Sequence, residues 1–128
     1  MTRARILVAE DHELMRKQVV RLLRRDFDVV EAVANGKALL EAAARLNPDV
    51  CVLDISMPHL NGIETVAHLK QSNSSPKVIF LTIHSDADFV GAAFKSGVEG
   101  YVFKTRMAID LVVAVKEVLA GRTFLSSC

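Results

Sequence analysis

The sequence lacks the features that mark membrane, secreted and disulfide-stabilised proteins. None of its apolar runs approaches the ~20 residues needed to span a bilayer. The basic amino terminus, residues 1–5, precedes a short apolar run that stops at Glu10 and Asp11, so it does not match a signal peptide. The two cysteines are poor disulfide partners, because Cys51 lies inside an apolar segment and Cys128 is the last residue. These absences predict a cytoplasmic protein without a membrane segment.

The chain also lacks an excess of charge of either sign. Lys and Arg total 16 against 15 Asp and Glu, a net charge of +1, so this segment is not expected to bind DNA itself. Hydrophobic residues make up 51% and charged residues 24%, as in an ordinary soluble protein. A chain of 128 residues without internal repeats or low-complexity tracts predicts one domain, which buries roughly two thirds of its unfolded surface.

Short apolar runs alternate with amphipathic segments along the whole chain. The five predicted strands are residues 5–9, 26–33, 50–53, 77–81 and 100–103. Apolar residues at helical spacing follow each run, within residues 15–23, 39–46, 63–69, 89–94 and 111–119. Five such alternations with short connections predict an α/β fold, with a mainly parallel sheet and helices on both faces.

Polar side chains follow four of the five predicted strands. They are Glu10 and Asp11 after the first strand, Asp54 after the third, Thr82 after the fourth and Lys104 after the fifth. In an open parallel sheet, ligands bind beyond the carboxyl ends of the strands, where the strand order reverses. If the strand order is 2-1-3-4-5, the first and third strands are neighbours. These side chains are then expected to converge on Asp54.

The predicted cluster contains the groups needed for phosphoryl transfer. Close carboxylates repel one another unless a cation compensates, and all-oxygen ligands suit Mg²⁺. An Asp carboxylate can then act as the nucleophile, while a lysine and a hydroxyl stabilise oxygens of the transferred group. Taken singly, Asp54 is more typical of a turn or helix cap, and Thr82 and Lys104 of a strand end and a solvated surface. Only the combination indicates phosphoryl transfer to Asp54.

On these residues the chain resembles the receiver domains of two-component response regulators. The matching segments, in the order and spacing of that family, are residues 8–12, 53–58, 61–62, 81–82 and 100–104. Residues 81–84 and 120–126 most resemble the LuxR-type (NarL/FixJ) transcriptional regulators. The resemblance implies a flavodoxin-like (βα)5 fold with five parallel strands in the order 2-1-3-4-5. It implies a receiver domain over residues 1–128, with a C-terminal helix-turn-helix output domain absent from this segment.

The resemblance also implies a role for each residue of the site. Asp54 would be the phosphoacceptor, Asp11 a direct Mg²⁺ ligand, Glu10 a ligand through water, Ser56 a ligand through its backbone carbonyl, Thr82 the switch hydroxyl, Lys104 the phosphate-pairing lysine and Tyr101 the aromatic switch residue. For Tyr101, a ring that simply covers part of the sheet edge is an equal alternative. Ser56 and His84 occupy positions at which the family varies in dephosphorylation rate.

The implied function is a phosphorylation-dependent signalling switch. A sensor histidine kinase would supply the phosphoryl group, and a homodimer would form on phosphorylation. DNA would be contacted only through the absent output domain. The domain would not be an enzyme in the usual sense, since it would catalyse only its own phosphorylation and dephosphorylation.

Two other classes of protein remain alternatives. One is an Mg²⁺-dependent phosphatase with an aspartyl intermediate, although the haloacid-dehalogenase-like pattern places its nucleophile after the first strand with a second Asp two residues later. The other is an interaction module that is never phosphorylated, which would need to keep neither Asp54 nor Lys104. A nucleotide-binding fold is less consistent, because no GxGxxG or Walker A loop follows the first strand.

Overall fold

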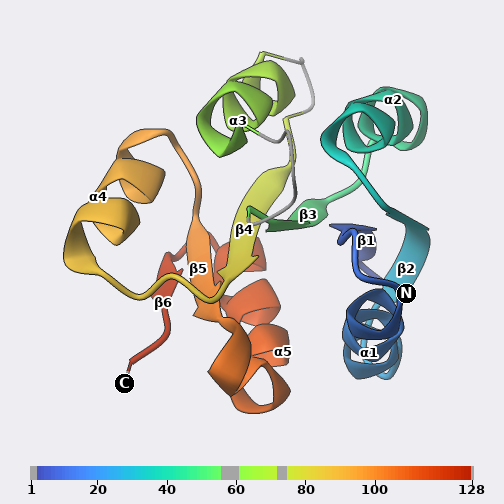
Figure 1. Cartoon of the computed structure of the whole chain (residues 1–128). Helices are drawn as coiled ribbons and strands as arrows, with labels where there is room; N and C mark the ends of the chain where they lie inside the picture. Colours follow the sequence, from blue (N-terminus) through green and yellow to red (C-terminus); the bar gives the residue numbers. More distant parts are fainter. Residues whose placement is uncertain (1–2, 56–60, 72–74, 128) are drawn as a thin grey trace.

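A parallel sheet with helices on both faces forms the centre of the computed structural model, which describes residues 3–55, 61–71 and 75–127 (Figure 1). The strands are β1 (Arg5–Ala9), β2 (Asp28–Val33), β3 (Val50–Asp54), β4 (Lys77–Thr82), β5 (Gly100–Phe103) and β6 (Phe124–Leu125). The helices are α1 (Glu13–Arg24), α2 (Gly36–Leu46), α3 (Gly62–Lys70), α4 (Ala87–Lys95) and α5 (Met107–Leu119), with a short 3₁₀ helix, η1 (Lys104–Arg106), before α5.

The strand order is β2-β1-β3-β4-β5-β6, and every neighbouring pair is parallel. The predicted fold and the order of its first five strands are confirmed. The number of strands was predicted too low, because β6 adds a sixth strand beside β5. Two residues are too few to show the periodicity from which a strand can be predicted. The pairing of β6 therefore depends on tertiary contacts.

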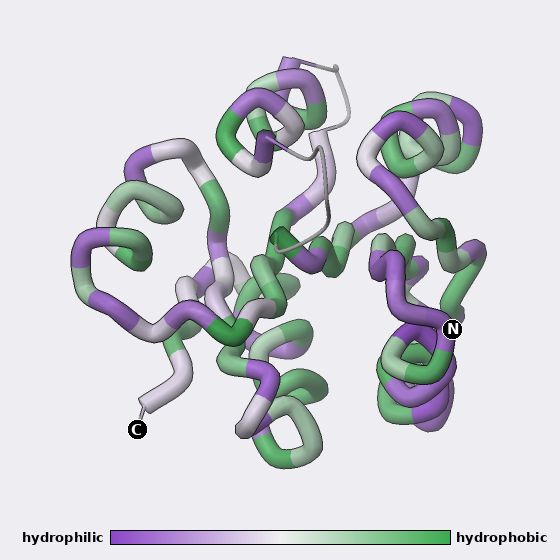
Figure 2. Tube along the Cα trace, in the orientation of Figure 1, coloured by the Kyte–Doolittle hydropathy of each residue, from purple (hydrophilic) through white to green (hydrophobic). Residues whose placement is uncertain are grey.

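Each face of the sheet has its own apolar core. Successive strand residues point to opposite faces. Leu7, Leu53 and Phe80 accordingly belong to the cluster that α2, α3 and α4 cover. Ile6 and Val8 belong to the cluster on the other face, which α1 and α5 cover. Figure 2 shows these apolar strands at the centre of the molecule and hydrophilic residues on the outer surface of α1. The central strand β3 is buried along its whole length.

Side-chain caps fix where four helices begin. His12, Asn35, Asn61 and Asp86 precede α1, α2, α3 and α4, and each accepts a hydrogen bond from a backbone N–H of the first turn. These caps lie in the loops that leave the carboxyl ends of the strands, so they order the edge of the sheet at which the polar residues gather. Among the helices in the described ranges, none combines the length and the apolar character needed to cross a membrane.

Candidate functional site

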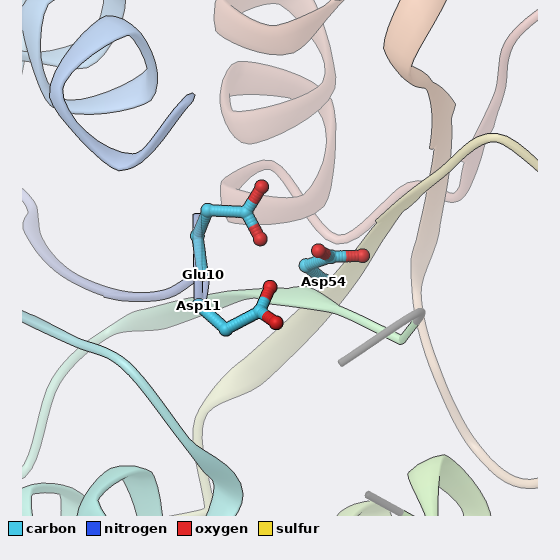
Figure 3. Close-up of side chains that lie close together, drawn as sticks. All are labelled: Glu10, Asp11 and Asp54. Carbon is cyan, nitrogen blue, oxygen red and sulfur yellow. The ribbon is translucent and has the colours of Figure 1, made fainter. Parts of the chain in front are cut away.

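Three carboxylates lie together at the carboxyl ends of β1 and β3. These strands are neighbours, and their register pairs Ala9 with Leu53, which brings the following residues, Glu10 and Asp54, side by side. Glu10, Asp11 and Asp54 each place a carboxylate oxygen within 4.8 Å of the other two. Figure 3 shows the side chains of Glu10 and Asp11 directed toward Asp54.

Two of these carboxylates are buried. Glu10 is 1% exposed and Asp54 is 2% exposed, whereas Asp11 lies at the surface. Burying a carboxylate is costly unless it is paired and hydrogen-bonded. Such a pair of buried acids therefore requires a cationic partner.

Lys104 is the cationic partner that the protein itself supplies. Its Nζ donates to Asp54 Oδ2 at 3.0 Å and to Glu10 Oε1 at 3.1 Å. The lysine side chain is only 14% exposed. Burial alone would lower the pKa of Lys104, but the hydrogen bonds and charges of Asp54 and Glu10 raise it above its ordinary value. The lysine therefore remains charged between the two acids.

One ammonium group does not fully compensate the two buried acids. Burial, followed by the proximity of Asp54, raises the pKa of Glu10 to about 8, although Lys104 acts in the opposite direction. Glu10 Oε2 is buried and has no hydrogen-bond partner among the residues that the structure describes. Glu10 Oε2 is thus a carboxylate oxygen that a further cation could bind.

The residues present fit Mg²⁺. Hard divalent cations bind oxygen ligands, and Mg²⁺ uses one or two carboxylates together with waters. Asp11, Asp54 and Glu10 supply such oxygens in one group. Ser56, the predicted carbonyl ligand, lies outside the described residues.

Thr82 and Tyr101 are joined through the backbone of His84. Thr82 is fully buried, and its hydroxyl accepts a hydrogen bond from the His84 N–H at 3.1 Å. Tyr101 donates its hydroxyl to the His84 carbonyl at 2.7 Å. In the sheet, Asp54 pairs with Leu81, the residue directly before Thr82. A displacement of Thr82 would therefore shift the backbone of His84 and, through it, the hydroxyl of Tyr101.

The ring of Tyr101 lies in the core rather than at the edge of the sheet. The residue is 0% exposed, and the ring packs against those of Phe80, Phe94 and Phe103, with centroids 5.9–6.4 Å apart. Burial, followed by the charge of Asp86, raises the pKa of the phenol to about 12. The alternative in which the ring covers the sheet edge does not describe this arrangement, since β6 lies at that edge.

Arg16 is a supporting residue that the sequence did not reveal. Its guanidinium donates to the backbone carbonyl of Glu10 at 2.9 Å and so ties α1 to the acidic loop. Four other basic residues lie in or just after the same helix, Lys17, Arg21, Arg24 and Arg25, and no sequence pattern separates Arg16 from them. Only the tertiary contact identifies it.

Comparison with known proteins identifies the same family along most of the chain. The family model described as "Response regulator receiver domain" matches residues 6–116. The transcriptional regulatory protein DegU of Brevibacillus brevis is 37% identical over 122 residues, covering 94% of this chain and 52% of DegU. The nitrate/nitrite response regulator protein NarL of Escherichia coli (strain K12) is 34% identical over 125 residues, covering 96% of this chain and 58% of NarL.

The structural comparison agrees. The two-component response regulator of the LuxR family from Aurantimonas sp. SI85-9A1 has a TM-score of 0.91 and 31% sequence identity, and the match covers 98% of this chain and 91% of that one. The chain spans about half the length of the curated relatives it matches. The family match includes Glu10, Asp11, Asp54, Thr82 and Lys104. The chain therefore belongs to the response regulator receiver domain family of two-component systems and is related to the LuxR-type transcriptional regulators.

Proposed function

We propose that this receiver domain is a phosphorylation-dependent switch in which Asp54 accepts a phosphoryl group from a sensor histidine kinase. The observation that carries this proposal is the pair of buried acids, Asp54 and Glu10, that share the ammonium group of Lys104. A purely structural domain would gain little from such a pair, because a buried ion pair is often no more stabilising than apolar residues of similar volume.

The chemistry proposed for Asp54 is a direct phosphoryl transfer. A carboxylate oxygen of Asp54 forms a bond to phosphorus while the P–N bond of phosphohistidine breaks, and the imidazole leaves with the bonding electrons. With acetyl phosphate as donor, the P–O bond breaks and acetate leaves. Lys104 contacts Asp54 in the unmodified protein and would pair with the oxygens of the transferred group. A bound Mg²⁺ ion, held by Asp11, Asp54 and Glu10, would neutralise negative charge on that group.

Phosphorylation would then change the neighbourhood of Thr82. The modification adds negative charge and acceptor oxygens close to its hydroxyl. That hydroxyl accepts the His84 N–H in the unmodified protein, so a new bond from Thr82 to the phosphoryl group would alter the backbone that Tyr101 also holds. The signal would be a population shift between two arrangements of β5, α4 and α5.

The output would be self-association and control of transcription. DegU is named as a transcriptional regulatory protein, and the matched segment covers 52% of DegU and 58% of NarL. We therefore propose that a DNA-binding domain outside this segment acts on DNA, and that phosphorylation promotes a homodimer. Within such a protein the receiver domain would catalyse only its own phosphorylation and dephosphorylation.

Intact-mass measurement tests the central step. Incubation with acetyl phosphate and Mg²⁺ should add one phosphoryl group to the wild type, and omission of Mg²⁺ should reduce the yield strongly. Asp54→Asn should remain unlabelled, whereas Asp88→Asn, which changes an exposed acid on α4, should be labelled as the wild type is. An equal label on Asp54→Asn would contradict the assignment. Sustained hydrolysis of small phosphoesters would favour the phosphatase, and no labelling of the wild type would favour the interaction module.

A further inference from the structure

The C-terminal strand β6 has few backbone contacts of its own. It consists of Phe124 and Leu125, which lie parallel to the start of β5 (Figure 1). The Phe124 N–H donates to the Glu99 carbonyl at 3.0 Å, and the Ser126 N–H donates to the Tyr101 carbonyl at 2.9 Å. Leu125 is 50% exposed, whereas Phe124 is partly buried and packs against the apolar core that α1 and α5 cover. A two-residue edge strand needs further contacts to stay in place.

Besides the packing of Phe124, Ser126 supplies polar contacts through its side chain. Its hydroxyl accepts the Phe103 N–H at 3.1 Å and donates to Asp110 Oδ2 at 2.8 Å. The Phe103 N–H belongs to β5, and a longer β6 would satisfy it with a backbone carbonyl. Ser126 is only 4% exposed, and Asp110 only 7%. The serine hydroxyl therefore ends the strand pairing with no loss of hydrogen bonding and fastens β6 to α5.

Asp110 connects Ser126 to the segment that carries Lys104 of the acidic site. Asp110 Oδ2, the oxygen that accepts from Ser126, also accepts from Arg106 Nε at 3.1 Å. Arg106 lies in η1, the short 3₁₀ helix that begins at Lys104. Lys104 in turn bridges Asp54 and Glu10. Arg106, Asp110 and Ser126, which we call the C-terminal latch, thus join the end of β6 to the residue that contacts the proposed phosphoacceptor.

We propose that, within the C-terminal latch, the bond between Ser126 and Asp110 holds β6 on β5 in the unmodified protein, and that Arg106 releases the strand when Asp54 is phosphorylated. This inference rests on the proposed function. A phosphoryl group on Asp54 places negative charge beyond the carboxylate, and Lys104 follows it. Because η1 is a single short turn, Arg106 moves with Lys104. Arg106 then pulls Asp110 Oδ2 away from the Ser126 hydroxyl, which donates to the same oxygen. The chain that leaves the receiver domain then separates from the sheet.

Hydrogen exchange in the unmodified protein tests the holding role. Ser126→Ala removes two buried hydrogen bonds, and at about 1 kcal/mol each their loss should accelerate exchange of the Phe124 and Ser126 amides about thirtyfold. Ser127→Ala removes the hydroxyl of an exposed neighbour and should leave both rates unchanged. Amides of β1 report whether Ser126→Ala is folded. Equal rates in Ser126→Ala and Ser127→Ala would overturn the holding role.

Hydrogen exchange after treatment with acetyl phosphate and Mg²⁺ tests the release. In wild-type protein that has gained one phosphoryl group by intact mass, loss of the single bond from Ser126 to Asp110 should accelerate exchange of the Phe124 and Ser126 amides about fivefold. Arg106→Gln leaves Ser126 bonded to Asp110 and should therefore show slow exchange both before and after phosphorylation.

The mass measurement separates the two ways in which the release can fail. A mass gain with unchanged exchange in the wild type would overturn the release while leaving the proposed function intact. Faster exchange in phosphorylated Arg106→Gln would show that the signal bypasses the latch, which also overturns the proposal. No mass gain in the wild type would overturn the proposed function, and the release with it.

Discussion

Lys104 Nζ lies 3.0 Å from Asp54 Oδ2 and 3.1 Å from Glu10 Oε1, so one ammonium group joins two buried carboxylates. Glu10 and Asp54 belong to neighbouring strand ends, whereas Lys104 arrives from the end of β5. The lysine therefore joins distant parts of the sheet edge electrostatically.

Lys104→Met should destabilise the protein. The substitution leaves two buried acids without their cation, and breaking a buried pair in this way typically costs about 3 kcal/mol. Urea denaturation at neutral pH measures the free energy of unfolding. Lys95→Met, at an exposed site on α4, should cost less than about 0.5 kcal/mol. Adding Glu10→Gln to Lys104→Met should recover part of the loss, and no recovery would contradict the pairing described here.

Mg²⁺ should stabilise the protein through the acidic cluster. A cation that binds the folded chain at about 100 times its Kd adds about 2.7 kcal/mol, which should raise Tm by about 5 °C or more. Asp11→Asn should lose most of this increase. Asp26→Asn removes an exposed carboxylate just beyond the end of α1, and this variant should retain the full increase in Tm. Thermal denaturation with and without Mg²⁺ gives the comparison, and an undiminished increase in Asp11→Asn would count against this site.

Thr82→Ala should separate phosphorylation from its consequence. The substitution removes the hydroxyl that accepts the His84 N–H but leaves Asp54 and Lys104 in place. We expect phosphorylation by acetyl phosphate to persist and phosphorylation-dependent self-association to be lost, as measured by intact mass and sedimentation. Thr82→Ser keeps the hydroxyl and should retain the response. A Thr82→Ala protein that associates as the wild type does would exclude this coupling.

The stability contribution of Asp110 should disappear in acid. Burial alone would raise the pKa of Asp110, but hydrogen bonds from Arg106 and Ser126 lower it below its ordinary value of 3.8. The unfolded chain therefore takes up this proton first as the pH falls. The contribution is fully present above pH 3.8 and is lost as the pH falls through the lower pKa of the folded state.

Asp110→Asn measures that contribution. At neutral pH this variant should be less stable than the wild type by about 1–2 kcal/mol, and the difference should shrink as the solution is acidified below pH 3.8. Asp88→Asn controls for the loss of one negative charge at the surface. Urea denaturation over this pH range provides the measurement. A difference in stability that grows in acid would contradict the lowered pKa of Asp110.

The sequence was sufficient to predict the α/β fold, the order of five strands and the group of acids at their ends. The fold class depends on periodicity, whereas the strand order was implied by the resemblance to receiver domains. The grouping of the acids follows from that order, because the carboxyl ends of parallel strands meet at one edge. Glu10, Asp11 and Asp54 were therefore expected to lie together before any contact was known. The roles of Thr82 and Tyr101 in switching, and the homodimer, remain predictions.

Tertiary structure alone decided how those groups interact. Lys104 contacts Glu10 across 94 residues of chain, and Ser126 contacts Phe103 across 23. Local sequence does not encode which donor meets which acceptor over such separations. It also does not encode which carboxylate becomes buried in the folded protein. For the same reason β6 was missed, because its two residues form a strand only where β5 provides hydrogen-bond partners and Ser126 is fastened to Asp110. Local periodicity thus predicts where strands end, whereas burial and long-range hydrogen bonding decide which side chains at those ends contact one another.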